Sequence, residues 1–228
     1  MNKISKTAEE APMKRVAGKS SVSSAKDVRQ RALSDVRRSM VLDAARAVFV
    51  ERGLEGTSIR EIAQRAGYTP GAIYGYFASK EEVYGALLGE SLDRLNACVE
   101  NAKAGGSQDP AAVLRRTAEA FFGFYRENPR DLDLGFYLFQ GMQPRGLTPE
   151  INDRLNHRLR DSLSHTEVAI AQLGVPQAEA QSEVTALFAH TVGLLVLSHT
   201  GRIRMFKRDS QGLFDSYLDL LVDRASKR

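Results

Sequence analysis

Only one cysteine, Cys98, occurs in this 228-residue sequence. A single cysteine excludes an intrachain disulfide, and nothing in the sequence resembles a Cys/His metal set. No run of about 18 apolar residues is present, which argues against a membrane-spanning helix. The first residues carry charges instead of an apolar stretch, so no secretory signal is expected. These absences predict a reduced, cytoplasmic protein with no metal and no cofactor.

The motifs of common enzyme classes are missing as well. There is no glycine-rich phosphate loop, no nucleophile elbow and no His/carboxylate metal motif. The histidines are scattered and lie far from Cys98 in sequence, although this does not exclude proximity in space; they are His157, His165, His190 and His199. We therefore expect no catalytic residues.

Positive charge is concentrated in the first part of the chain. Residues 1–80 contain 15 Lys and Arg against 8 Asp and Glu, whereas the remaining residues contain 17 and 20. This asymmetry indicates that only the first part meets a polyanion. Residues 1–33 nearly lack large apolar side chains, so they are predicted to form a flexible basic tail. The tail is either a solvated leader or a source of extra contacts to that polyanion from Lys26, Arg29, Arg31, Arg37 and Arg38.

The rest of the chain has the apolar spacing of helices. Val41, Ala45, Val48 and Phe49 share one helical face, and no period-2 run predicts a strand. Ser58 with Glu61 and Ser79 with Glu82 have the spacing of capping boxes. The sequence predicts an all-α fold of about nine helices, near residues 34–52, 58–65, 69–77, 79–102, 111–127, 132–140, 149–173, 176–200 and 210–225.

Residues 56–82 form the most informative block. Two short predicted helices are joined by Ala66-Gly67-Tyr68, and Gly67 can adopt the left-handed turn conformation. This is the layout of a helix-turn-helix. The second helix of such a motif enters the major groove N-terminus first. Small or hydrogen-bonding residues are needed there, and the sequence supplies Thr69, Pro70, Gly71 and Ala72.

Polar residues around this block are candidates for phosphate contacts. Tyr74 and Tyr76 cannot both face one core from positions i and i+2, so at least one is expected to be exposed and to suit a phosphate oxygen. Lys80 lies at a predicted helix N-terminus, where positive charge is unfavourable, so an external anion would explain it. Thr57 and Ser58 lie at the N-terminus of the predicted helix 58–65, where they either cap the helix or bind phosphate.

Residues 38–95 closely resemble the DNA-binding domain of the TetR (tetracycline-repressor-like) family. The matching segments are 44–49, Gly53, 56–63, Ala66-Gly67, 71–77 and 79–82. The resemblance implies a homodimer with a helix-turn-helix domain over residues 34–80 and a helical dimerisation and ligand-binding domain over residues 81–228. Such a dimer represses transcription from a palindromic operator until an unidentified small-molecule effector releases it. A transcriptional activator of the same family is an alternative, and a non-specific architectural DNA-binding protein is a more distant one.

The resemblance also implies roles for single residues. Base-edge contacts are implied for Arg60, Thr69, Pro70 and Gly71, with Ala72 in the same surface. Phosphate contacts are implied for Thr57, Ser58, Tyr74, Tyr76 and Lys80. Because Pro70 has no donor side chain, its readout can only be apolar, and Arg60 is the strongest candidate for reading a guanine.

The resemblance fades beyond about residue 95. Family analogy pairs the last two helices with their copies in a dimer, through Ala186, Ala189, Gly193, Leu197, Leu213, Tyr217 and Leu220. A monomer core would show the same pattern. Analogy also places a ligand cavity among the middle helices, beside Phe121, Phe122, Tyr125, Phe136, Tyr137, Phe139 and Met142. Ordinary core packing is the alternative for each of these side chains.

Overall fold

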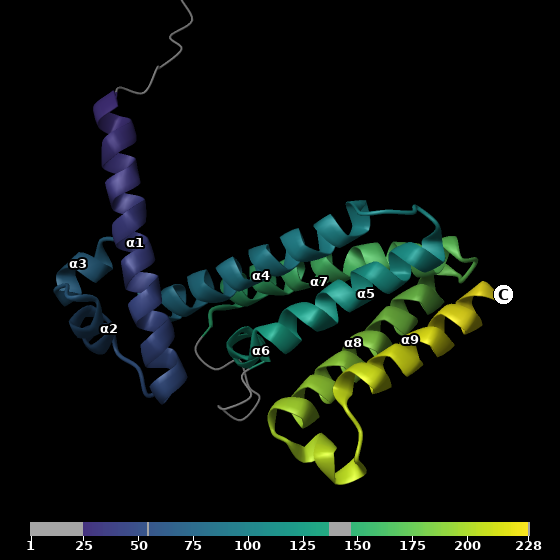
Figure 1. The fold of residues 1–228 in the computed structure, drawn as a ribbon. Coiled ribbons are helices and arrows are strands. Elements are labelled where there is room, and N and C mark those ends of the chain that lie inside the picture. The colour runs from purple at the N-terminus through teal and green to yellow at the C-terminus, as the bar shows by residue number, and fades with distance from the viewer. Residues whose placement is uncertain (1–24, 54, 137–146, 228) are drawn as a thin grey trace, which may run out of the picture. The chain divides into compact units, whose positions relative to one another are not determined.

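The computed structural model describes residues 25–53, 55–136 and 147–227 (Figure 1). Within these ranges the chain contains nine α-helices, one 3-10 helix and no strand, so the predicted all-α fold is confirmed. The elements are α1 (Ala25–Arg52), α2 (Ile59–Ala66), α3 (Pro70–Tyr74), α4 (Lys80–Ala104), α5 (Pro110–Glu127), α6 (Pro129–Phe136), α7 (Pro149–Gln172), α8 (Gln177–His199), η1 (Arg202–Phe206) and α9 (Ser210–Ser226).

The first helix begins at Ala25, earlier than the predicted start near residue 34. The expected flexible tail is therefore wrong for residues 25–33, whose side chains are almost all exposed. This stretch contains Ala, Arg, Gln and Leu, which have high helix propensity. High helix propensity therefore accounts for the part of α1 that lies upstream of Val41, the first buried residue of the helix.

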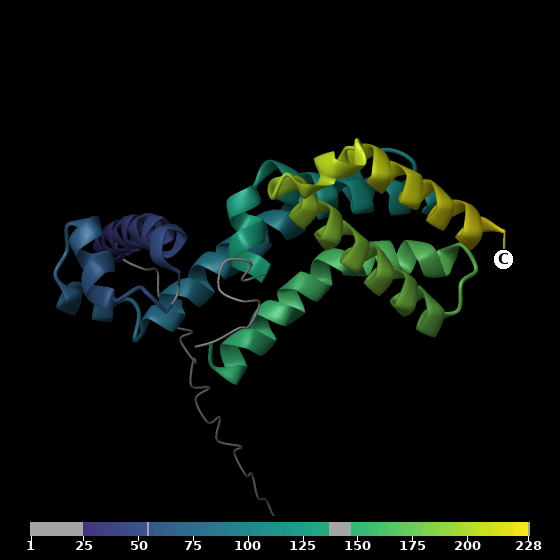
Figure 2. The same cartoon turned by 90° about the horizontal axis from the view of Figure 1, so that it is seen from below.

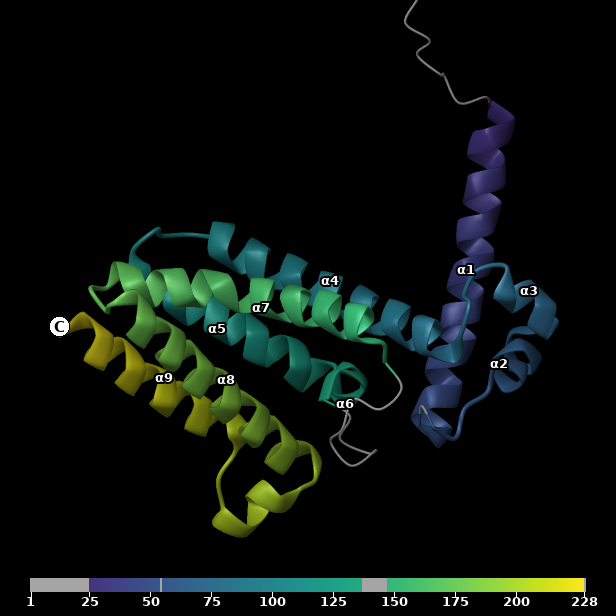
Figure 3. The same cartoon turned by 180° about the vertical axis from the view of Figure 1, so that it is seen from behind.

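Residues 38–228 form one compact unit. In it, α4, α5 and α7 pack extensively against one another, and α8 packs against α7 and α9. Figures 2 and 3 show α8 and α9 lying side by side with opposite directions. Phe122 of α5 stacks on Phe214 of α9 with ring centroids 4.3 Å apart, which joins the two groups of helices.

One helix of the described part, α8, is long and apolar enough to cross a membrane by length and composition alone. The sequence analysis did not single out this helix, because it looked for an unbroken apolar run. Thr191, Ser198 and other small polar residues interrupt the run in α8 without removing its apolar character. Core helices of soluble proteins meet the same criterion, so this helix is weak support for a membrane span.

Asp131 of α6 is the one buried acidic residue in the described ranges. Its Oδ1 accepts a hydrogen bond from Arg94 Nη2 of α4 at 2.7 Å and lies 3.8 Å from Arg46 Nη1 of α1. Arg46 also lies 3.7 Å from Glu90 of α4. A buried carboxylate is costly unless it is paired. These ion pairs therefore tie α6 to both α1 and α4.

We expect Asp131→Asn to lower the free energy of unfolding by about 1–2 kcal/mol. Breaking a fully buried pair costs about 3–5 kcal/mol, but here both arginines are partly exposed and regain water. Urea unfolding at neutral pH measures the change. Asp93→Asn is the control, because Asp93 pairs with Arg158 at 3.2 Å but is exposed. Equal and small losses of unfolding free energy in the two variants would mean that the buried ion pairs of Asp131 stabilise the fold no more than an exposed pair does.

Candidate nucleic-acid interface

The loop between α1 and α2 is closed by hydrogen bonds to its own backbone. Gly53 ends α1 in the left-handed conformation, with φ of 70°, and its N–H donates to the Phe49 carbonyl at 2.8 Å. The Thr57 hydroxyl donates to the Gly53 carbonyl at 2.6 Å. A Cβ on Gly56 would lie 2.4 Å from the Arg52 carbonyl oxygen, so only glycine fits at that position.

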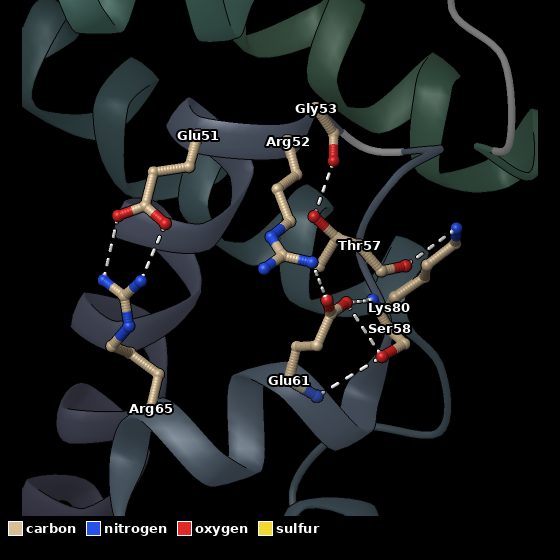
Figure 4. A network of polar contacts seen from close by, with 8 residues as sticks. All are labelled: Glu51, Arg52, Gly53, Thr57, Ser58, Glu61, Arg65 and Lys80. Carbon is tan, nitrogen blue, oxygen red and sulfur yellow. Dashed lines mark hydrogen bonds and ion pairs between the residues drawn. The ribbon is translucent and has the colours of Figure 1, made fainter.

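A reciprocal capping box starts α2. The Ser58 hydroxyl oxygen accepts from the Glu61 N–H at 3.3 Å, and Glu61 Oε2 accepts from the Ser58 N–H at 2.9 Å, as predicted. The Ser58 hydroxyl also donates to Glu61 Oε2 at 3.0 Å, and this hydrogen bond, followed by the one from the Ser58 N–H, lowers the pKa of Glu61. The Glu61 carboxylate also pairs with Arg52 of α1 (Figure 4). The box therefore fixes both the start of α2 and its attachment to α1.

A second ion pair fastens α2 to α1 one turn later. Arg65 donates two hydrogen bonds to the Glu51 carboxylate, at 3.0 and 2.7 Å (Figure 4). The hydrogen bond from Arg65 is the main reason that the pKa of Glu51 is lowered. Two of the cations in this region are thus engaged within the protein.

The predicted second capping box is only half formed. Ser79 Oγ accepts from the Glu82 N–H at 3.2 Å. The Glu82 carboxylate, however, accepts from the Ala78 N–H at 2.8 Å instead of from the Ser79 N–H. The start of α4 is capped all the same, because Ala78 lies one residue further upstream on the same turn.

The turn between α2 and α3 confirms the helix-turn-helix layout. Gly67 caps α2 in the left-handed conformation, with φ of 73°, and Pro70 is the first residue of α3. The Thr69 hydroxyl accepts from the Ala72 N–H at 3.3 Å. Ile73 is the one buried side chain of α3, so a single apolar anchor holds this short helix while its other side chains face outward.

The exposed surface of α2 and α3 combines one unpaired cation with small residues. Its exposed members are Arg60, Gln64, Thr69, Pro70, Gly71, Ala72 and Tyr74. A Cβ on Gly71 would meet nothing closer than Thr69 Oγ1 at 4.0 Å, so packing inside the protein does not require glycine there. Gln64 was missed by the sequence analysis, although its position four residues after Arg60 places it on the same helix face.

Other predicted DNA contacts have internal roles. Thr57 is buried, with its hydroxyl bonded to Gly53. Lys80 Nζ donates to the Thr57 carbonyl at 3.1 Å (Figure 4). It also donates to the Glu55 carbonyl at 3.3 Å. These carbonyls account for the lysine at the helix start, so the external anion we expected is not needed.

The two tyrosines differ as predicted. Tyr74 is 57% exposed, whereas Tyr76 is half-buried and packs against the core. The expectation that at least one of them faces outward is confirmed. Tyr74 therefore belongs to the exposed surface of α3, and Tyr76 borders it.

The residues predicted for dimerisation lie on the outer side of α8 and α9. Ala186, Ala189 and Gly193 are exposed, and Leu220 is 66% exposed. Half-buried members complete the set; they are Leu197, Leu213 and Tyr217. A Cβ on Gly193 would have nothing within 4 Å. The exposed members on α8 are therefore small, and the exposed member on α9 is the large apolar Leu220.

The residues predicted for ligand binding divide into three groups. Tyr125 and Phe136 line a cavity of about 210 Å³ between α4, α5, α6 and α7. Phe121 and Phe122 lie in the core instead, the latter against Phe214, as the core-packing alternative describes. Tyr137, Phe139 and Met142 lie outside the described residues. No cluster of three or more His, Cys, Asp or Glu side chains able to hold a metal occurs in the described ranges.

Residues 41–87 match the family model for bacterial regulatory proteins of the tetR family. The HTH-type transcriptional activator FasR of Mycolicibacterium smegmatis is 38% identical over 102 residues, which are 45% of this chain and 46% of FasR. The HTH-type transcriptional repressor KstR2 of Mycobacterium tuberculosis is 49% identical over 61 residues, 27% of this chain and 30% of KstR2. The chain thus spans less than half the length of these relatives.

A solved structure extends the likeness to the whole fold. The transcriptional regulator FadR from Bacillus subtilis, in complex with stearoyl-CoA, superposes with a TM-score of 0.62 at 20% identity. The superposition covers 80% of this chain and 96% of that one. The arrangement of helices is therefore shared beyond the helix-turn-helix.

We expect Gly56→Ala and Gly71→Ala to have opposite effects on stability. The first places a methyl group against the Arg52 carbonyl, and overpacking of this kind costs about 1–3 kcal/mol. The second fills open space in a helix, where alanine is favoured over glycine by up to about 1 kcal/mol. Thermal unfolding of both variants measures the difference. A Gly56→Ala protein as stable as the wild type would contradict the described loop.

Proposed function

Because this chain belongs to the tetR family of bacterial regulatory proteins, we propose that it is a transcriptional regulator that binds a specific operator in double-stranded DNA. The observation that carries the proposal is the surface of α3, held by Ile73 alone and otherwise small and exposed. Small residues at Gly71 and Ala72 let the backbone approach base edges when the helix enters the major groove.

Arg60 is proposed as the main reader of sequence. Arg52 at the end of α1 is paired with Glu61, and Arg65 near the end of α2 is paired with Glu51. Arg60 is exposed and forms no ion pair within the described part of the chain. A free guanidinium beside a recognition helix suits the O6 and N7 atoms of guanine. Thr69, Pro70 and Gly71 complete the proposed base contacts.

Phosphate contacts are proposed around this reader. Tyr74 and Tyr76 supply hydroxyl groups next to α3. Ser58 stands at the N-terminus of α2, where backbone N–H groups and the helix dipole favour an anion. Thr57 and Lys80 support this contact by holding the loop in place.

A homodimer is proposed to bind a palindromic operator. Two copies of the face that contains Ala186, Ala189 and Gly193 approach closely because no large side chain stands between them. Contact also removes Leu220 from water, and burial of apolar surface is the main favourable term in association. Each protomer then places one helix-turn-helix on one half-site.

A small-molecule effector is proposed to release the dimer from its operator in the bacterial cytoplasm. The effector lowers DNA affinity if it binds more tightly to a conformation of the dimer whose two helix-turn-helix domains are wrongly spaced for the operator. The FadR complex with stearoyl-CoA supports ligand binding by this fold. Repression is the first candidate outcome, and activation is the second because FasR is named an activator and KstR2 a repressor.

The decisive experiment is a footprint on the DNA upstream of the protein's own gene, at physiological salt and with excess competitor. We expect a discrete, two-fold symmetric protected site, there or in a genome-wide fragment selection. Arg60→Ala should weaken operator binding by about 5- to 150-fold, from the 1–3 kcal/mol of a bidentate base contact, and relax preference at one position of each half-site. Arg65→Ala is the matched control and should keep the preference.

Two results would contradict different parts of this proposal, namely sequence-specific binding and the role of Arg60. Salt-sensitive binding with no preferred fragment would favour the architectural alternative. An unchanged base preference in Arg60→Ala would remove Arg60 from the reading surface while leaving the regulator itself in place.

The dimer is tested separately by Gly193→Arg. This change adds a large side chain to open surface, so we expect the fold to persist. The dissociation constant of the dimer should rise at least about tenfold, equivalent to 1.4 kcal/mol. Sedimentation equilibrium measures the dissociation. Gly123→Arg on α5 is the control, because its Cβ also has nothing within 4 Å. Dimers of equal strength in both variants would place the interface elsewhere.

A further inference from the structure

The cavity between α4, α5, α6 and α7 has an apolar wall and a neutral rim. Its apolar lining comes from four helices and consists of Leu88, Leu92, Phe136, Leu155 and Leu159. Asn152 and Asn156, one turn apart on α7, supply its amides. Among the described residues that line the cavity, none carries a charge at neutral pH.

One polar group in this wall is buried without a partner. Tyr125 is fully buried, and its hydroxyl forms no hydrogen bond with any residue that the structure describes. An unsatisfied buried hydroxyl is costly, so it requires an explanation. The hydroxyl lies next to Gly135, which also lines the cavity, since a Cβ added to Gly135 would be 3.8 Å from the hydroxyl oxygen.

The ring of Tyr125 is held in this orientation by neighbouring aromatic rings. Phe121, Phe124 and Phe136 meet it edge to face, with centroids 5.3, 5.2 and 5.6 Å away. Rings packed in this way fix the direction of the hydroxyl. The donor is thus positioned before any ligand arrives, which lowers the entropic cost of binding.

We propose that this cavity binds a neutral, largely apolar effector, and that Tyr125 donates a hydrogen bond to a carbonyl oxygen of that effector. This proposal rests on the ligand-responsive part of the proposed function. A carboxylate or ammonium group would lose its hydration without meeting an opposite charge in the lining, which is strongly unfavourable. A plain hydrocarbon would leave the hydroxyl unsatisfied. A ketone or an ester meets both conditions.

The protonation state of Tyr125 agrees with this role. Burial, and to a lesser degree the charge of Asp131, raise the pKa of Tyr125 above its ordinary value of 10.0. The hydroxyl therefore keeps its proton at physiological pH and acts as a donor. The same negative charge disfavours an anionic group beside the hydroxyl.

The test uses three probes of equal heavy-atom count and similar shape: acetophenone, cumene and benzoate. Binding to the purified protein without DNA is measured by ligand-observed NMR titration. We expect acetophenone to bind the wild type about tenfold more tightly than cumene, the usual worth of one hydrogen bond to a buried donor. Benzoate should bind more weakly than acetophenone. Tyr125→Phe should abolish the preference for acetophenone over cumene.

Tyr84→Phe is the matched control. Tyr84 is a buried tyrosine of α4 outside this cavity, and its hydroxyl donates to the Leu134 carbonyl at 2.5 Å. We expect Tyr84→Phe to lower the melting temperature and keep the acetophenone preference. Tyr125→Phe should leave the melting temperature unchanged or raised, because it removes a hydroxyl that has no partner.

Three results would overturn the proposal: equal binding of acetophenone and cumene by the wild type, tighter binding of benzoate, or a preference that survives in Tyr125→Phe. A loss of stability in Tyr125→Phe as large as in Tyr84→Phe would do so as well, since it would mean that the hydroxyl is already satisfied within the protein. None of these measurements involves DNA. A failed footprint would therefore count against operator binding without touching the assignment of this cavity.

Discussion

The ion pairs of Asp131 are the constraint on which the arrangement of helices depends. Its carboxylate is buried, so it must be paired, and its two partners come from α1 and α4. Glu90 then links α4 back to Arg46 and, at 3.6 Å, to Arg38. These ion pairs attach α1 to α4 and α6, in addition to the apolar contact that Phe49 of α1 makes with Tyr84 of α4. Ion pairs with partly exposed arginines are individually weak.

Arg60 is singled out for base contacts because the other cations near α2 are engaged within the protein. Three cations near α2, namely Arg52, Arg65 and Lys80, are used to hold the loop and the helix in place. Arg60 remains exposed and unpaired in the described part of the chain. A basic composition alone predicts contact with a polyanion, but it does not distinguish structural cations from contacting ones. That distinction depends on which acid or carbonyl each cation reaches in space.

Local patterns were predictable, whereas long-range partners were not. The spacing of Ser58 and Glu61 predicted the capping box, and Gly67 the turn, because both depend on residues a few positions apart. The carbonyl partners of Lys80 were not predictable, since they lie more than 20 residues upstream. Phe122 was a ligand candidate until its stacking on Phe214 became visible. The start of α1 was misplaced because an exposed helix has no apolar pattern to reveal it.

The short helix α6 contacts both the cavity and α1, the helix that precedes the helix-turn-helix. Gly135 and Phe136 line the cavity, the Leu134 carbonyl accepts from Tyr84 of α4, and Asp131 faces Arg46 of α1. An effector alters DNA affinity only if it interacts differently with two arrangements of some element that also contacts the helix-turn-helix domain. In α6 a contact to the cavity and a contact to α1 lie within one eight-residue helix. The contact to Arg46, at 3.8 Å, is longer than the contact to Arg94, at 2.7 Å, so this carboxylate holds α6 more weakly to α1 than to α4.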